Sequence, residues 1–240
     1  MAASPEPGGP CAPGGDYLLH DVSCWLDDFQ FPGDQPVAVT GPFNFLTGAN
    51  PEFVYHLSTP TQAGTHVQGP RYFLADGATI DTVRLERFEG EAVLVDLPAR
   101  GRDTGLAELR EGLADRPLAG RILLLRTGHM AEVIASGELE PARRPGLSLE
   151  AAQWLVDSGV QMVAIDSVGV ESRETANYEV NVLLCRAGIL ILEGLVDLEG
   201  LGPGHLWLEA FPLKLRGVEG TPCRAVVKEY PQPPPGPEPR

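Results

Sequence analysis

The amino-acid sequence predicts a mixed α/β domain, and two patterns carry this prediction. Four short apolar runs between residues 92 and 192 do not alternate with polar residues, which is typical of strands covered on both faces. Segments with helical spacing separate these runs, so strand, helix and strand follow one another and imply parallel pairing. The first half is instead rich in alternating, strand-like segments. The four apolar runs are 92–97, 122–125, 162–166 and 189–192.

The first half contains three segments that predict strands, at 17–25, 37–45 and 53–57. Alternation of apolar and polar residues is the signal in the first two. The sequence Phe31-Pro32-Gly33-Asp34 predicts a turn between them, because proline and glycine favour turns. Phe43 and Phe45 are candidate contacts for a bound molecule, although core packing explains each of them as well.

Helical spacing appears three times after residue 100. Leu106, Leu109 and Leu113 predict a helix with Thr104 as its cap. Ser148 can cap a second helix, which Gly159 would end. The segment 171–187 contains a third, with Val180, Leu183, Leu184 and Ala187 facing inward. We expect two further strands at 211–215 and 224–227.

The two ends of the chain differ from the rest. Residues 1–15 are mostly Pro, Gly, Ala and Ser, and residues 231–240 are rich in proline. We expect both ends to be disordered, because neither can bury much apolar surface. This leaves one folded domain at 16–230.

Charge and cysteine content limit the function classes. The chain has 18 Lys and Arg against 33 Asp and Glu, a net charge of −15, which argues against nucleic acid and anionic membranes as partners. Its four cysteines lack metal-binding spacing and predict reduced thiols. No signal peptide and no apolar run of about 18 residues is found. We therefore expect a cytoplasmic protein.

The segment 62–73 is the candidate functional site, and it holds one of only five histidines. Gly64 lets the backbone bend or approach a ligand closely, and Pro70 interrupts regular pairing. The side chains of Gln62, His66 and Gln68 would then crowd one small volume. The alternative is an ordinary turn with one partly buried histidine.

This segment resembles the His-x-Gly-Thr-His-x-Asp-x-Pro-x-His signature of the metal-dependent cyclase and bacterial kynurenine formamidase family. The match holds at Gly64, Thr65, His66 and Pro70. Three positions depart from it: Gln62 and Gln68 replace a metal-binding histidine and aspartate, and Tyr72 replaces a further histidine. The loop is therefore kept while its metal ligands are replaced.

The resemblance covers the whole folded region, including Arg126-Thr127-Gly128, Pro145-Gly146-Leu147 and 211–224. It implies a single domain of the swivelling β/β/α type with a mixed sheet, assembled as a homodimer or higher oligomer. It also implies that a helix residue and a residue after the next strand complete the site. Asn181 stands where the family carries a helix histidine, and Glu193 matches the family glutamate.

These replacements decide which cofactor we expect. Catalytic zinc takes about three protein ligands of His, Cys or carboxylate type, and manganese prefers carboxylate with imidazole. Only His66 and Glu193 are of these types, and neutral amides are poor substitutes. We therefore expect no metal cofactor, with zinc or manganese as the alternative.

We expect a cyclase-family enzyme that works without metal as an acid–base cyclase or dehydratase, a lyase, on a small biosynthetic intermediate of the natural-product kind. The proposed catalytic residues are His66 as proton carrier, Glu193 as its partner and Tyr72 as neutral donor. The proposed substrate-binding residues are Gln62, Gln68, Asn181, Phe43 and Phe45. One alternative is a metal-dependent hydrolase of amides or cyclic amides, as in kynurenine formamidase or isatin hydrolase. A second is a catalytically inactive binding protein.

Two weaker candidates complete the prediction. Asp166 ends an apolar run, at the end of a strand where ligands gather in α/β folds, although the family resemblance gives it a structural part. His205, next to Trp207, is placed in a surface loop and is interpreted as structural.

Overall fold

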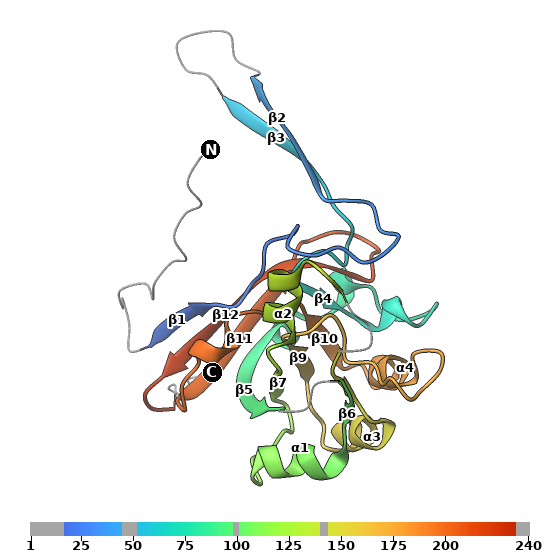
Figure 1. The fold of residues 1–240 in the computed structure, drawn as a ribbon, viewed down its shortest axis with the longest axis vertical. Coiled ribbons are helices and arrows are strands. Elements are labelled where there is room, and N and C mark those ends of the chain that lie inside the picture. The colour runs from blue at the N-terminus through green and yellow to red at the C-terminus, as the bar shows by residue number, and fades with distance from the viewer. Residues whose placement is uncertain (1–16, 45–51, 98–100, 140–143, 234–240) are drawn as a thin grey trace.

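The computed structural model describes residues 17–44, 52–97, 101–139 and 144–233 (Figure 1). The ends that we expect to be disordered lie outside these ranges, apart from 231–233. Phe45 also lies outside them.

Eight strands form one mixed sheet, in the order β1-β12-β11-β5-β7-β9-β10-β4 (Figure 1). β4 also pairs with β12, so the sheet closes on itself like a barrel. β5, β7, β9 and β10 are parallel to one another, whereas β1, β4, β11 and β12 pair antiparallel. These strands are β1 (Leu18–Asp21), β4 (His66–Gln68), β5 (Glu89–Asp96), β7 (Ile122–Arg126), β9 (Met162–Ile165), β10 (Leu190–Glu193), β11 (His205–Pro212) and β12 (Gly220–Tyr230).

Helices lie along the parallel half of the sheet (Figure 1). The α-helices are α1 (Leu106–Leu113), α2 (His129–Ser136), α3 (Leu149–Asp157) and α4 (Glu179–Arg186), and a two-stranded sheet joins β6 (Asp103–Thr104) to β8 (Gly146–Leu147). Short 3-10 helices are η1 (Pro70–Tyr72), η2 (Ile80–Thr82), η3 (Leu85–Arg87) and η5 (Leu198–Gly200). Ser148 caps α3 as predicted, since its Oγ accepts from the Ala151 N–H at 3.1 Å.

Alternation within each strand divides the core into two clusters. On β7, Leu123 and Leu125 pack with α1, α3 and α4, whereas Ile122 and Leu124 pack with residues of β11 and β12 inside the closed sheet. Successive strand side chains point to opposite faces, so a strand covered on both sides is apolar throughout. The interior cluster includes Val67 of β4. The predicted covered strands are therefore confirmed.

Several sequence-based expectations are wrong in detail. β11 spans His205–Pro212 rather than 211–215, and its buried residues Leu206, Leu208 and Ala210 form an alternation that the prediction missed. His205 therefore lies on a strand and not in a loop. The α1 N-cap is Gly105 rather than Thr104, and Ala187 is exposed because α4 has ended one residue earlier. α2 was not predicted.

A two-stranded hairpin, β2 (Ala38–Asn44) with β3 (Phe53–Ser58), projects away from the closed sheet (Figure 1). Its apolar side chains are exposed, with Phe53 at 63% and Val39 at 64% of their full accessibility. Isolated two-stranded hairpins are marginally stable in water, so this one is unusual for a single subunit.

No helix in the described ranges is long and apolar enough to span a membrane. Cys24, Cys185 and Cys223 are free thiols.

The turn before β4 depends on Gly64. Its φ is +55°, and a Cβ added there would lie 2.9 Å from Leu26 Cα and 3.0 Å from the Trp25 carbonyl oxygen. Only glycine combines this backbone conformation with so close an approach. Gly120 offers a matched control, because its φ is +70° and a Cβ there would meet nothing within 4 Å.

We predict that Gly64→Ala destabilises the protein more than Gly120→Ala. The control carries only the cost of a left-handed alanine, about 1–2 kcal/mol. Gly64→Ala adds a backbone clash, so its total cost is expected to exceed about 3 kcal/mol. Urea unfolding of the two variants measures both costs, and equal losses of stability would contradict the argument.

Candidate active site

The pairing of β4 with β10 brings the main predicted residues together. His66 lies directly opposite Glu193 in this antiparallel register, and Gln68 lies opposite Ile191. Val67 packs inside the closed sheet, so its neighbours His66 and Gln68 point to the opposite, helix-covered face. Glu193 points the same way because Leu192 beside it also packs inside.

The imidazole of His66 is completely buried and has a defined orientation. Its Nδ1 lies 2.8 Å from the Gly64 carbonyl oxygen. A carbonyl oxygen can only accept, so Nδ1 carries a hydrogen and the neutral ring presents an unprotonated Nε2. Nε2 lies 3.5 Å from Glu193 Oε2 and has no hydrogen-bond partner in the described part of the chain. The ring is therefore held with its basic nitrogen toward the carboxylate.

Glu193 is also held from the other side. Gln68 Nε2 donates to Glu193 Oε1 at 3.1 Å, which leaves Oε2 to face the imidazole. Gln68 and Glu193 are diagonal neighbours across the two strands, a distance that long side chains bridge. Both side chains are buried. The carboxylate thus keeps a fixed position beside His66.

Asn181, on the buried face of α4, is held by a carboxylate that sequence reasoning missed. Its Nδ2 donates to Glu171 Oε2 at 2.7 Å. Glu171 is buried and also accepts from the Thr175 hydroxyl and the backbone N–H groups of Val180 and Asn181. Four donors therefore stabilise its charge. Asn181 Oδ1 remains buried without a partner.

Gln62 sits at the join between β4 and β12. Its Nε2 donates to Glu219 Oε1 at 3.0 Å, and the Thr61 hydroxyl donates to the same oxygen. Gly220 allows this approach, because a Cβ there would lie 3.0 Å from both Gln62 Nε2 and Gln68 Cα. Gln62 and Gln68 are consequently close neighbours. Glu219 is a second carboxylate that the sequence did not single out.

Tyr72 lies in η1, partly exposed at 43%. Burial, together with the smaller effect of the nearby charges of Glu193 and Glu219, raises the pKa of Tyr72 to about 12. The phenol is therefore a neutral O–H donor at physiological pH. Its ring meets that of Phe73 edge to face, with 4.5 Å between the ring centroids. The Phe73 ring lies in turn 5.3 Å, centroid to centroid, from that of Tyr178, next to the start of α4.

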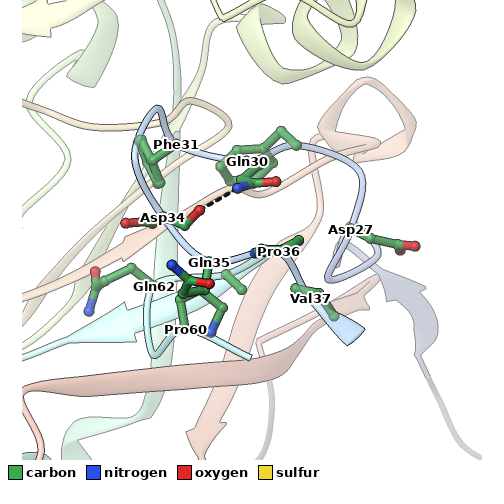
Figure 2. A pocket seen from close by; sticks show the side chains of 11 residues that line it. Asp27, Gln30, Phe31, Asp34, Gln35, Pro36, Val37, Pro60 and Gln62 are labelled. Carbon is green, nitrogen blue, oxygen red and sulfur yellow. Dashed lines mark hydrogen bonds between the residues drawn. The ribbon is translucent and has the colours of Figure 1, made fainter. Parts of the chain in front are cut away.

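A cavity of about 90 Å³ adjoins Gln62 (Figure 2). The loop before the hairpin and the residues before β4 form its walls, and Gln30 Nε2 fixes that loop through the Asp34 carbonyl oxygen. The lining residues are Asp27, Phe29, Gln30, Phe31, Asp34, Gln35, Pro36, Val37, Pro60, Gln62 and Ala63.

The structure thus brings His66, Gln68 and Glu193 into one group, with Gln62 beside it. It does not bring Phe43 to this group within one subunit, because Phe43 lies on the projecting hairpin and contacts His56 (Figure 1). Glu171 and Glu219 escaped notice because their partners are distant in sequence or on another element. The one hint in the sequence is that Glu171 is an acidic residue in the predicted segment 171–187, ahead of the helix that begins at Glu179.

Three acceptor atoms in this region are buried and lack a partner within the described chain: His66 Nε2, Gln68 Oε1 and Asn181 Oδ1. Buried acceptors of this kind are costly unless a donor satisfies them. A molecule that carries O–H, N–H or an acidic C–H would suit such a surface. The site is therefore built to receive protons or donors.

The donor set does not fit a zinc or manganese ion. The described residues contain no group of three or more His, Cys, Asp or Glu side chains that could hold a metal. His66 and Glu193 supply two suitable donors. The other candidates, Gln62, Gln68 and Asn181, are neutral amides whose N–H groups donate to the carboxylates of Glu219, Glu193 and Glu171. Such a set falls short of about three strong ligands.

Asp166, the candidate at the end of β9, has a structural part. Its two carboxylate oxygens accept from the backbone N–H groups of Thr127 and Gly128 and from the Thr127 hydroxyl, at 2.6–2.7 Å. These bonds hold the turn that leads into α2. Burial raises the pKa of Asp166 to about 6, although the three donors oppose the shift.

Comparison with known proteins identifies relatives of this chain. A family model described as "Putative cyclase" matches residues 18–172. Cyclase-like protein 3 of Oryza sativa subsp. japonica is 33% identical over 174 residues, which cover 70% of this chain and 63% of that protein. Kynurenine formamidase of Salinibacter ruber is 30% identical over 203 residues, which cover 85% of this chain and 92% of that protein.

Solved structures show the same fold. Isatin hydrolase A from Ralstonia solanacearum superimposes with a TM-score of 0.76 at 22% identity, over 89% of this chain and 92% of that one. A protein described as a potential metal-dependent hydrolase with cyclase activity superimposes with a TM-score of 0.71 at 22% identity, over 89% and 98% of the two chains. At these identities the likeness establishes the fold alone.

We predict that Asp166 makes stability fall as pH rises from about 4 to about 6. The folded state holds the Asp166 proton more tightly than the unfolded state, whose pKa is near 3.8. The full destabilisation is thus reached above pH 6 and amounts to about 3 kcal/mol.

Asp166→Asn removes this titration. As pH rises, the wild type should therefore lose stability relative to the variant, so that any advantage of the wild type at pH 4 shrinks or is reversed at pH 7. Urea unfolding at several pH values measures it. A difference that stays constant from pH 4 to pH 7 would refute the assignment.

Proposed function

Since the chain belongs to the cyclase family, we propose that it is an enzyme that transfers protons on a small carbonyl compound without a bound metal. Relatives named as enzymes support the enzyme class. The preferred reaction is a cyclisation or dehydration, and the proposed roles are His66 as base and acid, Glu193 as its partner and Tyr72 as donor. One observation carries the proposal: the buried His66 Nε2 faces Glu193 Oε2 at 3.5 Å and finds no hydrogen-bond partner among the described residues.

The His66–Glu193 pair suits a residue that takes up a proton and returns it. With Nδ1–H bound to the Gly64 carbonyl oxygen, neutral His66 can accept only at Nε2. Two acceptors 3.5 Å apart repel each other, and a proton taken by Nε2 turns this repulsion into attraction between imidazolium and carboxylate. Glu193 thus stabilises the protonated intermediate state of His66.

A dehydration can be followed atom by atom. Nε2 of His66 takes a proton from the carbon next to the substrate carbonyl, and the released electron pair forms a carbon–carbon double bond. This double bond forms between the α and β carbons, by way of an enolate that places charge on the carbonyl oxygen, as the bond from the β carbon to its hydroxyl oxygen breaks. The departing hydroxyl takes the proton back from His66 and leaves as water. The neutral Tyr72 phenol donates to the carbonyl oxygen while negative charge develops there.

Hydrolysis of an amide or cyclic amide is the second candidate. The kynurenine formamidase of Salinibacter ruber, 30% identical over most of both chains, favours this reaction. In this version His66 takes a proton from water, the hydroxyl adds to the carbonyl carbon, and the proton passes to the leaving nitrogen. The amides at Gln62, Gln68 and Asn181 argue against a metal as the source of hydroxide.

We further propose that two copies of the chain assemble through the β2–β3 hairpin. The exposed apolar residues of this arm, Val39, Phe53, Val54, Tyr55 and Leu57, form a surface of the kind that is covered in assemblies. Neither strand of the arm contains a charged residue, whereas the chain has a net charge of −15. Contact through the arm therefore joins two acidic subunits without opposing their carboxylates.

We predict that His66→Asn lowers kcat by about 10²–10⁴, the usual contribution of general acid–base catalysis, with little change in KM. Glu193→Gln should lower kcat as well. Turnover is measured on β-hydroxy carbonyl compounds, which gain a conjugated double bond, and on N-formylkynurenine and isatin. Undiminished turnover by both variants would place the chemistry elsewhere.

Metal analysis of the same wild-type preparation separates the two candidates further. We expect less than stoichiometric zinc or manganese and no loss of rate with chelator. Bound metal at one equivalent, with activity lost on chelation and restored by the ion, would overturn the metal-free proposal.

The assembly is tested by light scattering after gel filtration. Wild type is expected to be a dimer or larger, and Phe53→Glu with Tyr55→Glu is expected to produce monomers, since buried like charges oppose association. Leu85→Glu, at another exposed apolar residue, is the matched control and should leave the assembly intact. A monomeric wild type would refute the proposal.

A further inference from the structure

Arg144 is a cation next to the proposed reacting pair, and the mechanism above leaves it unused. It lies just before β8, half-buried. Its Nη2 donates to the Glu171 carbonyl oxygen at 3.0 Å, and its Nε is buried without a hydrogen-bond partner among the residues that the structure describes. A buried donor on a charged group is costly to leave unsatisfied, so the unpaired Nε of Arg144 calls for an explanation.

Gly169 lies between Arg144 and Glu193 of the site. A Cβ added at Gly169 would lie 3.1 Å from Arg144 Nη1 and 3.8 Å from Glu193 Oε1. The guanidinium and the carboxylate therefore flank the same small space. Any side chain at 169 would press on the guanidinium, so glycine is what leaves room for Arg144 beside Glu193.

Three carboxylates of the described chain lie around this space and its neighbours. Glu193 faces His66, Glu171 holds Asn181, and Glu219 holds Gln62. The whole chain carries a net charge of −15, which would repel an anion. A guanidinium with unused donors offsets this repulsion at one point and matches the geometry of a carboxylate.

We propose that Arg144 binds a carboxylate group of the substrate, so that the enzyme acts on small carboxylic acids. The inference rests on the proposed function for the location of the reacting pair and adds the substrate class. Arg144 Nε and Nη1 bind the carboxylate, while the rest of the molecule reaches His66. Gly169 sets the position of the guanidinium.

Direct binding tests this without any turnover. Isothermal titration compares benzoate with benzamide, which has the same shape but no charge, on the full chain. Wild type should bind benzoate more tightly. Arg144→Ala should weaken benzoate binding by about tenfold to a hundredfold, the usual range for a charged hydrogen bond, and leave benzamide unchanged.

Three variants make the test specific. Arg144→Lys keeps the charge but not the fork of donors, so its loss should be smaller. Gly169→Ala keeps Arg144 but crowds it, and should also weaken benzoate selectively. Arg84→Ala removes an equal charge at an exposed pair with Glu86 and should change nothing.

Equal binding of benzoate by wild type and Arg144→Ala, or no preference of wild type for benzoate over benzamide, would overturn the proposal. Unfolding curves of each variant confirm that it is folded before titration. Because the readout is affinity, it stands apart from the His66 test: a failure of His66→Asn to reduce turnover leaves the benzoate result interpretable, and the reverse also holds.

Discussion

Strand β4, three residues long, pairs with β10 on one side and with β12 on the other. This double pairing closes the sheet and leaves β4 without a free edge. It also fixes His66 opposite Glu193 on one partner strand and opposite Pro222 on the other. A shift of one residue would turn His66 into the apolar interior and Val67 out of it. The burial of Val67 therefore holds the site in register.

Carboxylates around the site are each matched by particular donors. Glu171 accepts from four donors, Glu219 from Thr61 and Gln62, and Glu193 from Gln68. Buried charges persist only when paired or hydrogen-bonded, and amide side chains provide such donors without adding charge. Glutamine and asparagine, which are weak metal ligands, are thus good partners for these carboxylates. Each of the three amides therefore pairs with a different carboxylate.

The sequence was informative where a residue's role depends on its immediate neighbours. Apolar runs predicted the covered strands, Ser148 predicted a cap, and the segment around Gly64 and His66 predicted the family. It was uninformative where the partner is remote. Gln62 and Glu219 are 157 residues apart, and no local pattern links them. The hairpin's strands were predicted, but their projection was not, because alternation indicates a covered face without saying what covers it.

What the site shares with the family it resembles is the geometry of one histidine and one glutamate. The loop, the closed sheet and the glutamate place an imidazole against a carboxylate whether or not an ion lies between them. In a metal site these two side chains would be anchored by the ion. In this protein the Gly64 carbonyl oxygen and the Gln68 amide also hold them, at 2.8 and 3.1 Å. Orientation is therefore supplied by the protein before any ligand arrives, which is the condition for electrostatic catalysis in a buried site. Rigid strands rather than loops carry three of the side chains involved, His66, Gln68 and Glu193, so the arrangement costs little reorganisation when a proton moves.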